Sequence, residues 1–146
     1  MNRTKIEWCD YYKGWLEAFI DSEGSLSIIK EKRPHFVAGV TFKPILSISN
    51  RCVPMLEQAK ILIGGGAITK HDRKGCYQFS TTANILRGLL PKITLIAKEK
   101  QRLILIECLS ILDRHAGKNM PRTTDELNHL QSLFSAIRKE NGRWVL

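Results

Sequence analysis

Residues 15–25 read WLEAFIDSEGS, and this stretch decides which fold we expect for the chain. Its apolar positions Leu16, Phe19 and Ile20 are three and four residues apart, which is the spacing of one face of a helix. Gly24 is expected to end that helix, because glycine tolerates the left-handed conformation that often follows a helix. The stretch therefore predicts an amphipathic helix that ends at a glycine.

The last turn of this helix carries two acids, Asp21 and Glu23. Negative charges at a helix C-terminus oppose the helix dipole, at a cost of about 0.3–1 kcal/mol for each exposed charge. A bound metal cation would offset this cost. Earlier in the same helix, Gly14 and Ala18 are four residues apart and form a strip with almost no side chain, which permits another backbone to come close.

Residues 16–24, LEAFIDSEG, resemble the LAGLIDADG motif of homing endonucleases. The two agree at the leucine, the central apolar pair, the first acid and the glycine. Glu23 replaces the aspartate that is commoner in the family and keeps a carboxylate at that position, whereas Glu17 stands where the family usually has a small residue. The sequence contains no second copy of the motif.

The composition is that of one soluble globular domain over residues 1–146, with 43% hydrophobic and 25% charged residues. A formal net charge of +9 favours a polyanionic partner, nucleic acid above all. The four cysteines lack the close spacing of a zinc site. No signal peptide or membrane span is expected, so the protein should be intracellular and make no membrane contact, in the cytoplasm of a prokaryote or in an organelle.

The rest of the chain alternates between strand-like and helix-like hydrophobic periods. The segments expected to be regular are strands at 25–33 and 36–50, a helix at 53–63, hairpin strands at 67–71 and 76–80, and helices at 82–90, 97–115 and from 123 onward. Pro44 indicates an edge or a bulge in the second strand, and Thr123 with Glu126 makes a capping box. This order predicts an α+β fold, αββαββα, in which a four-stranded antiparallel sheet has helices on one face.

The other face of this sheet is expected to be polar and basic, and to lie in the major groove of double-stranded DNA. Alternate side chains of a twisted antiparallel sheet can reach base edges there. The candidate DNA-binding residues are Ser25, Ser27, Ile29, Glu31, Arg33, Thr41, Lys43, Ser47, Ser49, Thr69, His71, Arg73 and Gln78. The alternative is an ordinary solvated sheet face, which is common in antiparallel sheets.

The resemblance to the family implies a saddle-shaped sheet and a catalytic site at the end of the motif helix. Glu23 and the backbone carbonyl of Ser22 would bind Mg²⁺ or Mn²⁺, since hard oxygen ligands suit such cations. Lys98 would orient water or stabilise developing negative charge. The polar position at the end of the second strand would be Asn50, with the adjacent Arg51 as an equally plausible contributor.

A single motif implies a homodimer in this family, with Gly14, Ala18 and Asp21 at the interface and a roughly palindromic target. Asp21 has a second possible role, which is to hold the end of the motif helix. The implied function is that of an intron-encoded homing endonuclease that makes a metal-dependent double-strand break. Two alternatives stay open, namely an RNA maturase that binds intron RNA on the same fold, and a DNA-binding regulator that does not cut.

Overall fold

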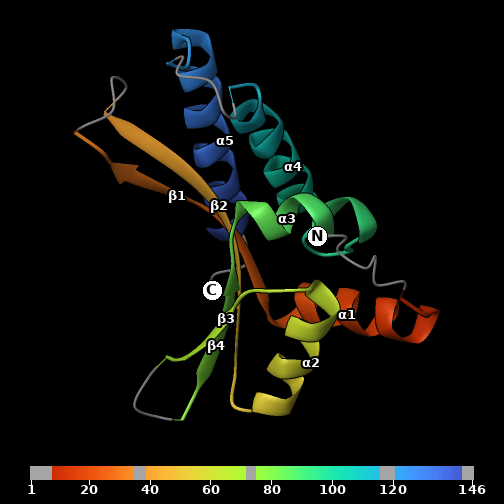
Figure 1. The fold of residues 1–146 in the computed structure, drawn as a ribbon. Helices are drawn as coiled ribbons and strands as arrows, with labels where there is room; N and C mark the ends of the chain where they lie inside the picture. Colours follow the sequence, from red (N-terminus) through yellow and green to blue (C-terminus); the bar gives the residue numbers. More distant parts are fainter. Residues whose placement is uncertain (1–7, 35–38, 72–74, 116–120, 143–146) are drawn as a thin grey trace, which may run out of the picture.

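The protein is built on an antiparallel sheet that carries helices on one face (Figure 1). The computed structural model describes residues 8–34, 39–71, 75–115 and 121–142. Its elements are, in order, α1 (Asp10–Glu23), β1 (Gly24–Lys32), β2 (Val40–Asn50), α2 (Val53–Ile63), β3 (Ala67–Lys70), β4 (Tyr77–Thr81), α3 (Ala83–Leu89), the 3-10 turn η1 (Leu90–Lys92), α4 (Glu99–Asp113) and α5 (Thr124–Gly142). The predicted α+β fold and its αββαββα order are confirmed.

The four strands lie in the order β1-β2-β4-β3, and each neighbouring pair is antiparallel. The prediction that Pro44 occupies an edge-like position is right for a local reason. Pro44 pairs with Ile28 of β1, but β4 pairs only with residues 46–50 of β2. Proline has no N–H to donate, and at this point β4 does not run alongside β2 to receive one. The register with β1 is continuous through Pro44, without a bulge.

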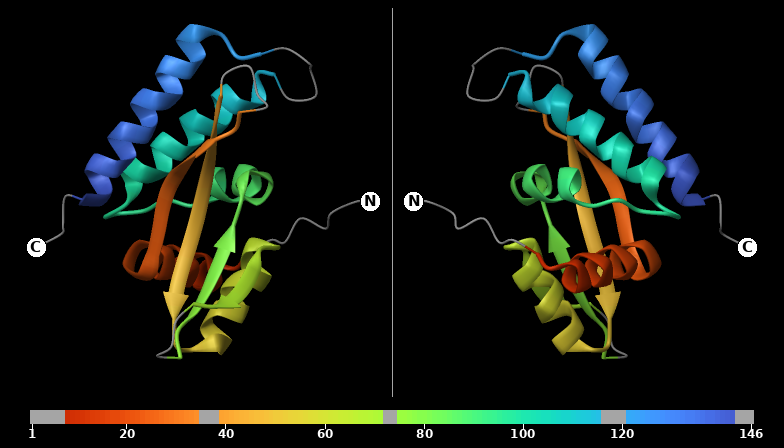
Figure 2. Two further views of the ribbon diagram at one scale, coloured as in Figure 1. Left: turned by 90° about the vertical axis from the view of Figure 1, so that its left-hand side faces the viewer. Right: turned by 90° about the vertical axis from the view of Figure 1, so that its right-hand side faces the viewer.

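The hydrophobic core lies between the sheet and the helices on one of its faces (Figure 2). Leu26 and Leu46 project from the neighbouring strands β1 and β2, and both are fully buried. Leu16 and Ile20 of α1 are fully buried against the same core. Each such side chain stabilises the fold by about 1.5–3 kcal/mol relative to an exposed position. The apolar stripe of α1 therefore fixes which side of this helix faces the sheet.

The conformation expected for Gly24 is wrong, although α1 does end there. Gly24 has φ −82° and ψ 157°, which is extended, and α1 passes directly into β1 without a left-handed residue. Glycine is needed here for a different reason. A Cβ atom on Gly24 would lie 2.6 Å from the carbonyl oxygen of Ile20, too close for any side chain. The tight helix-to-strand junction therefore depends on the absence of a side chain.

The last helix, α5, packs against α4 and runs along the edge strand β1 (Figure 1). Asn141 donates a hydrogen bond to the backbone oxygen of Leu26 at 2.9 Å, which ties the end of α5 to β1. The predicted capping box is confirmed at the start of α5. The N–H of Glu126 donates to Thr123 Oγ1 at 3.2 Å, and the N–H of Thr123 donates to Glu126 Oε1 at 2.9 Å.

Within the described residues, no helix is both long enough and apolar enough to cross a bilayer.

Candidate functional site

The C-terminal end of α1 presents an exposed carboxylate, that of Glu23. Among the described residues, the Glu23 side chain has no hydrogen bond or salt bridge. The neighbouring Ser22 is also exposed, and its hydroxyl donates to the backbone oxygen of Ala18 at 2.8 Å. The serine side chain is thus used within the helix, while Glu23 offers its oxygens to solvent.

Lys98 extends to the same helix end from the segment that precedes α4. Its Nζ donates to the backbone oxygen of Asp21 at 2.5 Å, with the backbone oxygen of Ile20 at 3.5 Å. Burial lowers the pKa of Lys98, and the negative charges of Asp21 and Glu23 act in the opposite direction. The structure therefore brings two predicted site residues, Lys98 and Glu23, to one end of α1.

Asp21 is occupied within the chain. Its carboxylate oxygens accept hydrogen bonds from the backbone N–H groups of Ile96 at 3.0 Å, Ala97 at 3.0 Å and Lys98 at 2.9 Å. The offset for this acid at a helix C-terminus is therefore a set of backbone donors, and the expected metal cation is not needed for it. Asp21 fits the predicted role of holding a helix end, and its carboxylate faces its own chain.

Asn50 lies at the end of β2, near the start of β1, where α1 ends. The register places Ile48 opposite Gly24, the first residue after Glu23, and Asn50 is two residues further along β2. The side-chain oxygen of Asn50 accepts the N–H of Cys52 at 2.8 Å and so stabilises the turn into α2. Donation from Asn50 to another group would therefore come from its amide nitrogen. The adjacent Arg51 is exposed.

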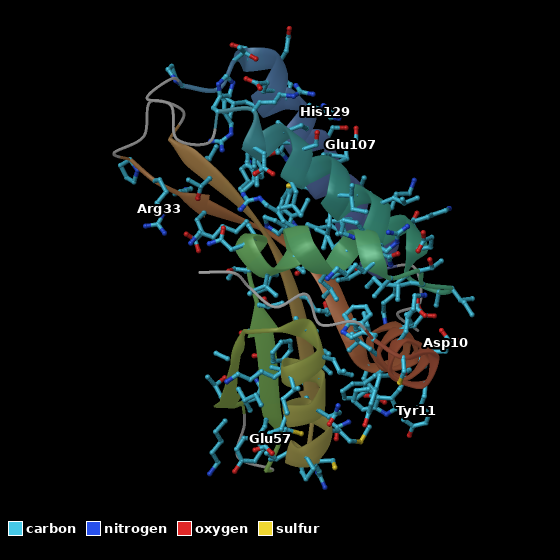
Figure 3. The ribbon with its side chains drawn as sticks, turned by 45° about the vertical axis from the view of Figure 1, so that its right-hand side comes forward. Asp10, Tyr11, Arg33, Glu57, Glu107 and His129 are labelled. Carbon is cyan, nitrogen blue, oxygen red and sulfur yellow. The ribbon has the colours of Figure 1, made fainter. Side chains whose placement is uncertain are left out.

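The side of α1 opposite the core carries Gly14 and Ala18, and both are exposed. A Cβ atom at Gly14 would meet nothing within 4 Å. Tyr11 projects from the same helix and is 73% exposed (Figure 3). In the segment beside the end of α1, Ile96 is 94% exposed. The small-residue strip is thus accompanied by large apolar side chains that face solvent.

The strand register gathers the candidate DNA-binding side chains on one face, which we call the open sheet face. Residues directly opposite each other in an antiparallel pair project to the same side. The pairs on this face are Ser25 with Ser47, Ser27 with Ile45, Ile29 with Lys43, Glu31 with Thr41, Ser49 with Gln78, and Thr69 with Gln78.

Three further candidates lie beyond the ends of the strands. Arg33 directly follows β1 and is exposed at its far end (Figure 3). His71 directly follows β3 and is also exposed. Arg73 lies outside the described residues.

Glu31 is the one acid among the candidate DNA-binding residues, and two cations flank it. Its Oε2 accepts hydrogen bonds from Arg33 Nη2 at 2.7 Å and lies 3.2 Å from Lys43 Nζ. The hydrogen bond from Lys43 is the main cause that lowers the pKa of Glu31. The open sheet face is therefore net positive around this acid.

Glu17 has a role at this site that the sequence did not reveal. Its Oε2 accepts the backbone N–H of Thr94 at 2.6 Å and the ammonium of Lys13 at 3.1 Å. Thr94 is far away in the sequence, and a backbone N–H carries no residue signal. In the sequence, Glu17 stands out only because the family motif usually has a small residue at this position.

The end of α1 has oxygen atoms that could act as metal ligands. Within the described residues, no three or more His, Cys, Asp or Glu side chains lie together in a way that could hold a metal. At the end of α1 this chain offers the Glu23 carboxylate together with the helix C-terminal carbonyl of Ser22, whereas the carbonyls of Ile20 and Asp21 already accept the Lys98 ammonium. These are hard oxygen donors, and their chemistry fits Mg²⁺ or Mn²⁺ as ligands contributed to a shared site.

Solved structures of homing endonucleases share the fold. I-Vdi141I, an archaeal intron-encoded homing endonuclease complexed with DNA, is 25% identical with a TM-score of 0.79, over 90% of this chain and 84% of that chain. I-CvuI, in complex with a DNA target in the presence of Mg and with the DNA not cleaved, is 15% identical with a TM-score of 0.71, over 89% of this chain and 81% of that one.

The I-SmaMI LAGLIDADG homing endonuclease bound to cleaved DNA is 20% identical with a TM-score of 0.76. That match covers 96% of this chain but 48% of the I-SmaMI chain, so this chain spans about half the length of that one. No protein-family model and no curated protein matches the sequence.

Proposed function

We propose that this chain is a LAGLIDADG homing endonuclease, a site-specific DNA endonuclease that acts as a homodimer with a divalent metal. The observation that carries the proposal is the position of Glu23 and Lys98. The exposed carboxylate of Glu23 and the half-buried ammonium of Lys98 lie at the same end of the motif helix, where that helix leads into a sheet with a polar, basic open face. The shared fold with DNA-bound homing endonucleases supports the same reading.

The metal would be held by Glu23 and the backbone carbonyl of Ser22. Both are oxygen donors of the kind that Mg²⁺ and Mn²⁺ prefer. When bound, such an ion supplies an activated water and neutralises charge on the leaving oxygen of a phosphodiester. The chain's own part is to hold these two donors at the tight helix-to-strand junction of α1 and β1.

Lys98 would stabilise negative charge that develops on the phosphate, or orient the attacking water. Its ammonium is already held by hydrogen bonds to the carbonyl oxygens at the end of α1. A charge that is pre-positioned in this way costs little reorganisation during the reaction. Asn50 would contribute from the end of β2 through its amide nitrogen.

DNA would lie along the open sheet face, with its major groove against the strands. Serine, threonine, lysine, arginine and glutamine side chains on this face can read base edges. The net charge of +9 would provide phosphate attraction that depends on salt concentration. Two cationic side chains of this face, Arg33 and Lys43, lie close together, because both contact the carboxylate of Glu31.

The homodimer would form through α1. The strip of Gly14 and Ala18 lets two helices approach closely, and the exposed Tyr11 and Ile96 would become buried beside it. Two copies of this chain would match the length of the I-SmaMI chain, of which one copy covers 48%. Two-fold symmetry would bring the two Glu23 residues together and call for a roughly palindromic target.

Two other functions fit the same fold. An RNA maturase would use the basic surface for intron RNA and would not need the carboxylate of Glu23. A DNA-binding regulator would keep the open sheet face and lack cutting. The retained carboxylate next to the Lys98 ammonium favours the nuclease.

The test is incubation of the purified protein with the intronless allele of its host gene, or with a randomised DNA library, in Mg²⁺. A double-strand break at one site that disappears in Glu23→Gln supports the nuclease. Tight specific DNA binding without cutting by the wild-type protein would point to the regulator. Binding that is selective for the intron RNA would point to the maturase.

A further inference from the structure

The segment that leads into α4 is held by carboxylates through its backbone. The five consecutive N–H groups of residues 94–98 all donate to acids. Thr94 donates to Glu17, Leu95 donates to Glu99, and the next three donate to Asp21. We infer that Glu17 and Asp21 are positioning residues for Lys98, which sits at the end of this segment; the catalytic meaning of this inference rests on the proposed function.

The two acids are placed for this task by the helix that carries the motif. Glu17 and Asp21 are four residues apart on α1, so they lie on one side of the helix, one turn from each other. The Glu17 carboxylate accepts the backbone N–H of Thr94 at 2.6 Å. The Asp21 carboxylate accepts the backbone N–H of Lys98 at 2.9 Å, and the backbone carbonyl of Asp21 accepts the Lys98 ammonium at 2.5 Å. Both ends of the segment are thereby tied to α1.

The segment has no regular structure of its own to keep its shape. Residues 93–95 are neither helix nor strand, and α4 begins only at Glu99. Ile93 and Leu95 anchor it from inside, since both are buried in the core. The carboxylates hold it from the other side, and hydrogen bonds to charged acceptors are stronger than neutral ones. The position of Lys98 is therefore fixed relative to α1, the helix that also carries Glu23.

Glu17 has a distinct part in this arrangement, because a small residue at its position could not reach Thr94. Lys13 also contacts Glu17, at 3.1 Å, and so helps to orient its carboxylate. Displacement of a reacting group by about 1 Å can lower a rate by about 100-fold. Release of the Thr94 end should therefore slow cutting through misplacement of Lys98, although the contacts of the Glu17 carboxylate are with Thr94 and Lys13.

The test uses purified protein with a cleavable target and compares Glu17→Ala, Glu17→Gln and the matched control Glu57→Ala. Glu57 is an exposed acid on α2, remote from α1's end (Figure 3). Glu17→Ala should lower kcat by about 10-fold to 100-fold and change the Kd for DNA in Ca²⁺ less than about 2-fold. Glu17→Gln keeps an oxygen acceptor for Thr94 and should recover most of the rate. Glu57→Ala should cut like the wild type.

Two further measurements separate positioning from general loss of structure. Amide hydrogen exchange should show lost protection at Thr94 in Glu17→Ala, with the core strands unchanged. In a double-mutant cycle, Glu17→Ala should add little to the defect of Lys98→Ala, because the first change acts through the second residue.

Full additivity of the two changes, or an equal loss of kcat and affinity in Glu17→Ala, would overturn the positioning role while the nuclease function stands. If the wild-type protein cuts no DNA, the proposed function itself fails and the catalytic meaning of the inference falls with it.

Discussion

Replacement of Glu23 by glutamine is the most informative perturbation of this molecule. The change keeps the size and shape of the side chain and removes the charge proposed to hold the metal. Glu23 is exposed and, within the described residues, makes no hydrogen bond or salt bridge that its replacement would break. The change does remove the electrostatic attraction between Glu23 and the Lys98 ammonium, which belongs to the same site. Loss of function in Glu23→Gln can therefore be attributed to chemistry.

The expected magnitudes follow from this placement. A fall in single-turnover cleavage of at least about 100-fold corresponds to a barrier higher by about 2.7 kcal/mol. Stability should hold or rise, because an exposed acid at a helix C-terminus costs about 0.3–1 kcal/mol. For a chain of this size, such a change would raise the Tm by about 1–4 °C.

The assay is single-turnover cleavage at saturating protein in Mg²⁺, with DNA affinity measured separately in Ca²⁺ and without metal. Affinity should be unchanged or higher, since a negative charge next to the phosphates has been removed. Glu57→Gln is the matched control, because it makes the same chemical change at an exposed position of α2. Full cutting by Glu23→Gln would refute the metal assignment and, with it, most of the case for a nuclease.

Four other predictions test separate parts of the molecule. Lys98→Ala should lower kcat by at least about 10-fold while DNA affinity changes little, because the ammonium acts on transition-state charge; a parallel loss in both would mark it as a plain phosphate contact. Gly14→Leu should weaken the homodimer in sedimentation, since a Cβ there meets open space in one chain but would meet the partner helix; a native chain that sediments as a stable monomer would remove the dimer. Arg33→Ala and Gln78→Ala should each relax preference at a few base pairs by about 1–3 kcal/mol in a randomised-site selection, and unchanged preferences would show that these side chains do not read bases. The pKa of Glu126 is lowered to about 2 by its hydrogen bonds from the capping box and His115. Its contribution to stability is therefore complete above its ordinary pKa near 4.5 and is lost as the pH falls toward 2. Glu126→Gln should flatten the pH dependence of the free energy of unfolding between these pH values, which an acid titration of that free energy would check.

The sequence alone was sufficient for features that depend on residues a few positions apart. The apolar spacing of Leu16, Phe19 and Ile20 identified the buried face of α1, and all three are in the core. The bounds 53–63 of the second helix coincide with those observed. The capping box was readable because its partners, Thr123 and Glu126, are three residues apart. Such features follow from local geometry, which repeats in every protein.

The candidate site was only partly readable. The resemblance to the family selected Glu23 from its motif and Lys98 from the basic stretch at the start of the long helix, and the structure places both at one end of α1. The conformation of Gly24 was misread, because its requirement for glycine comes from a close approach to Ile20 at the junction and not from a left-handed turn.

Only the tertiary structure decided which groups Asp21 and Glu17 contact. Their partners are backbone N–H groups 75–77 residues away, at Ile96, Ala97, Lys98 and Thr94. Every residue except proline carries the same N–H group, so no pattern of side chains marks which ones a carboxylate will reach. That choice is made when the core positions the segment before α4 beside α1, and it turns a departure from the motif at Glu17 into a contact that the chain uses.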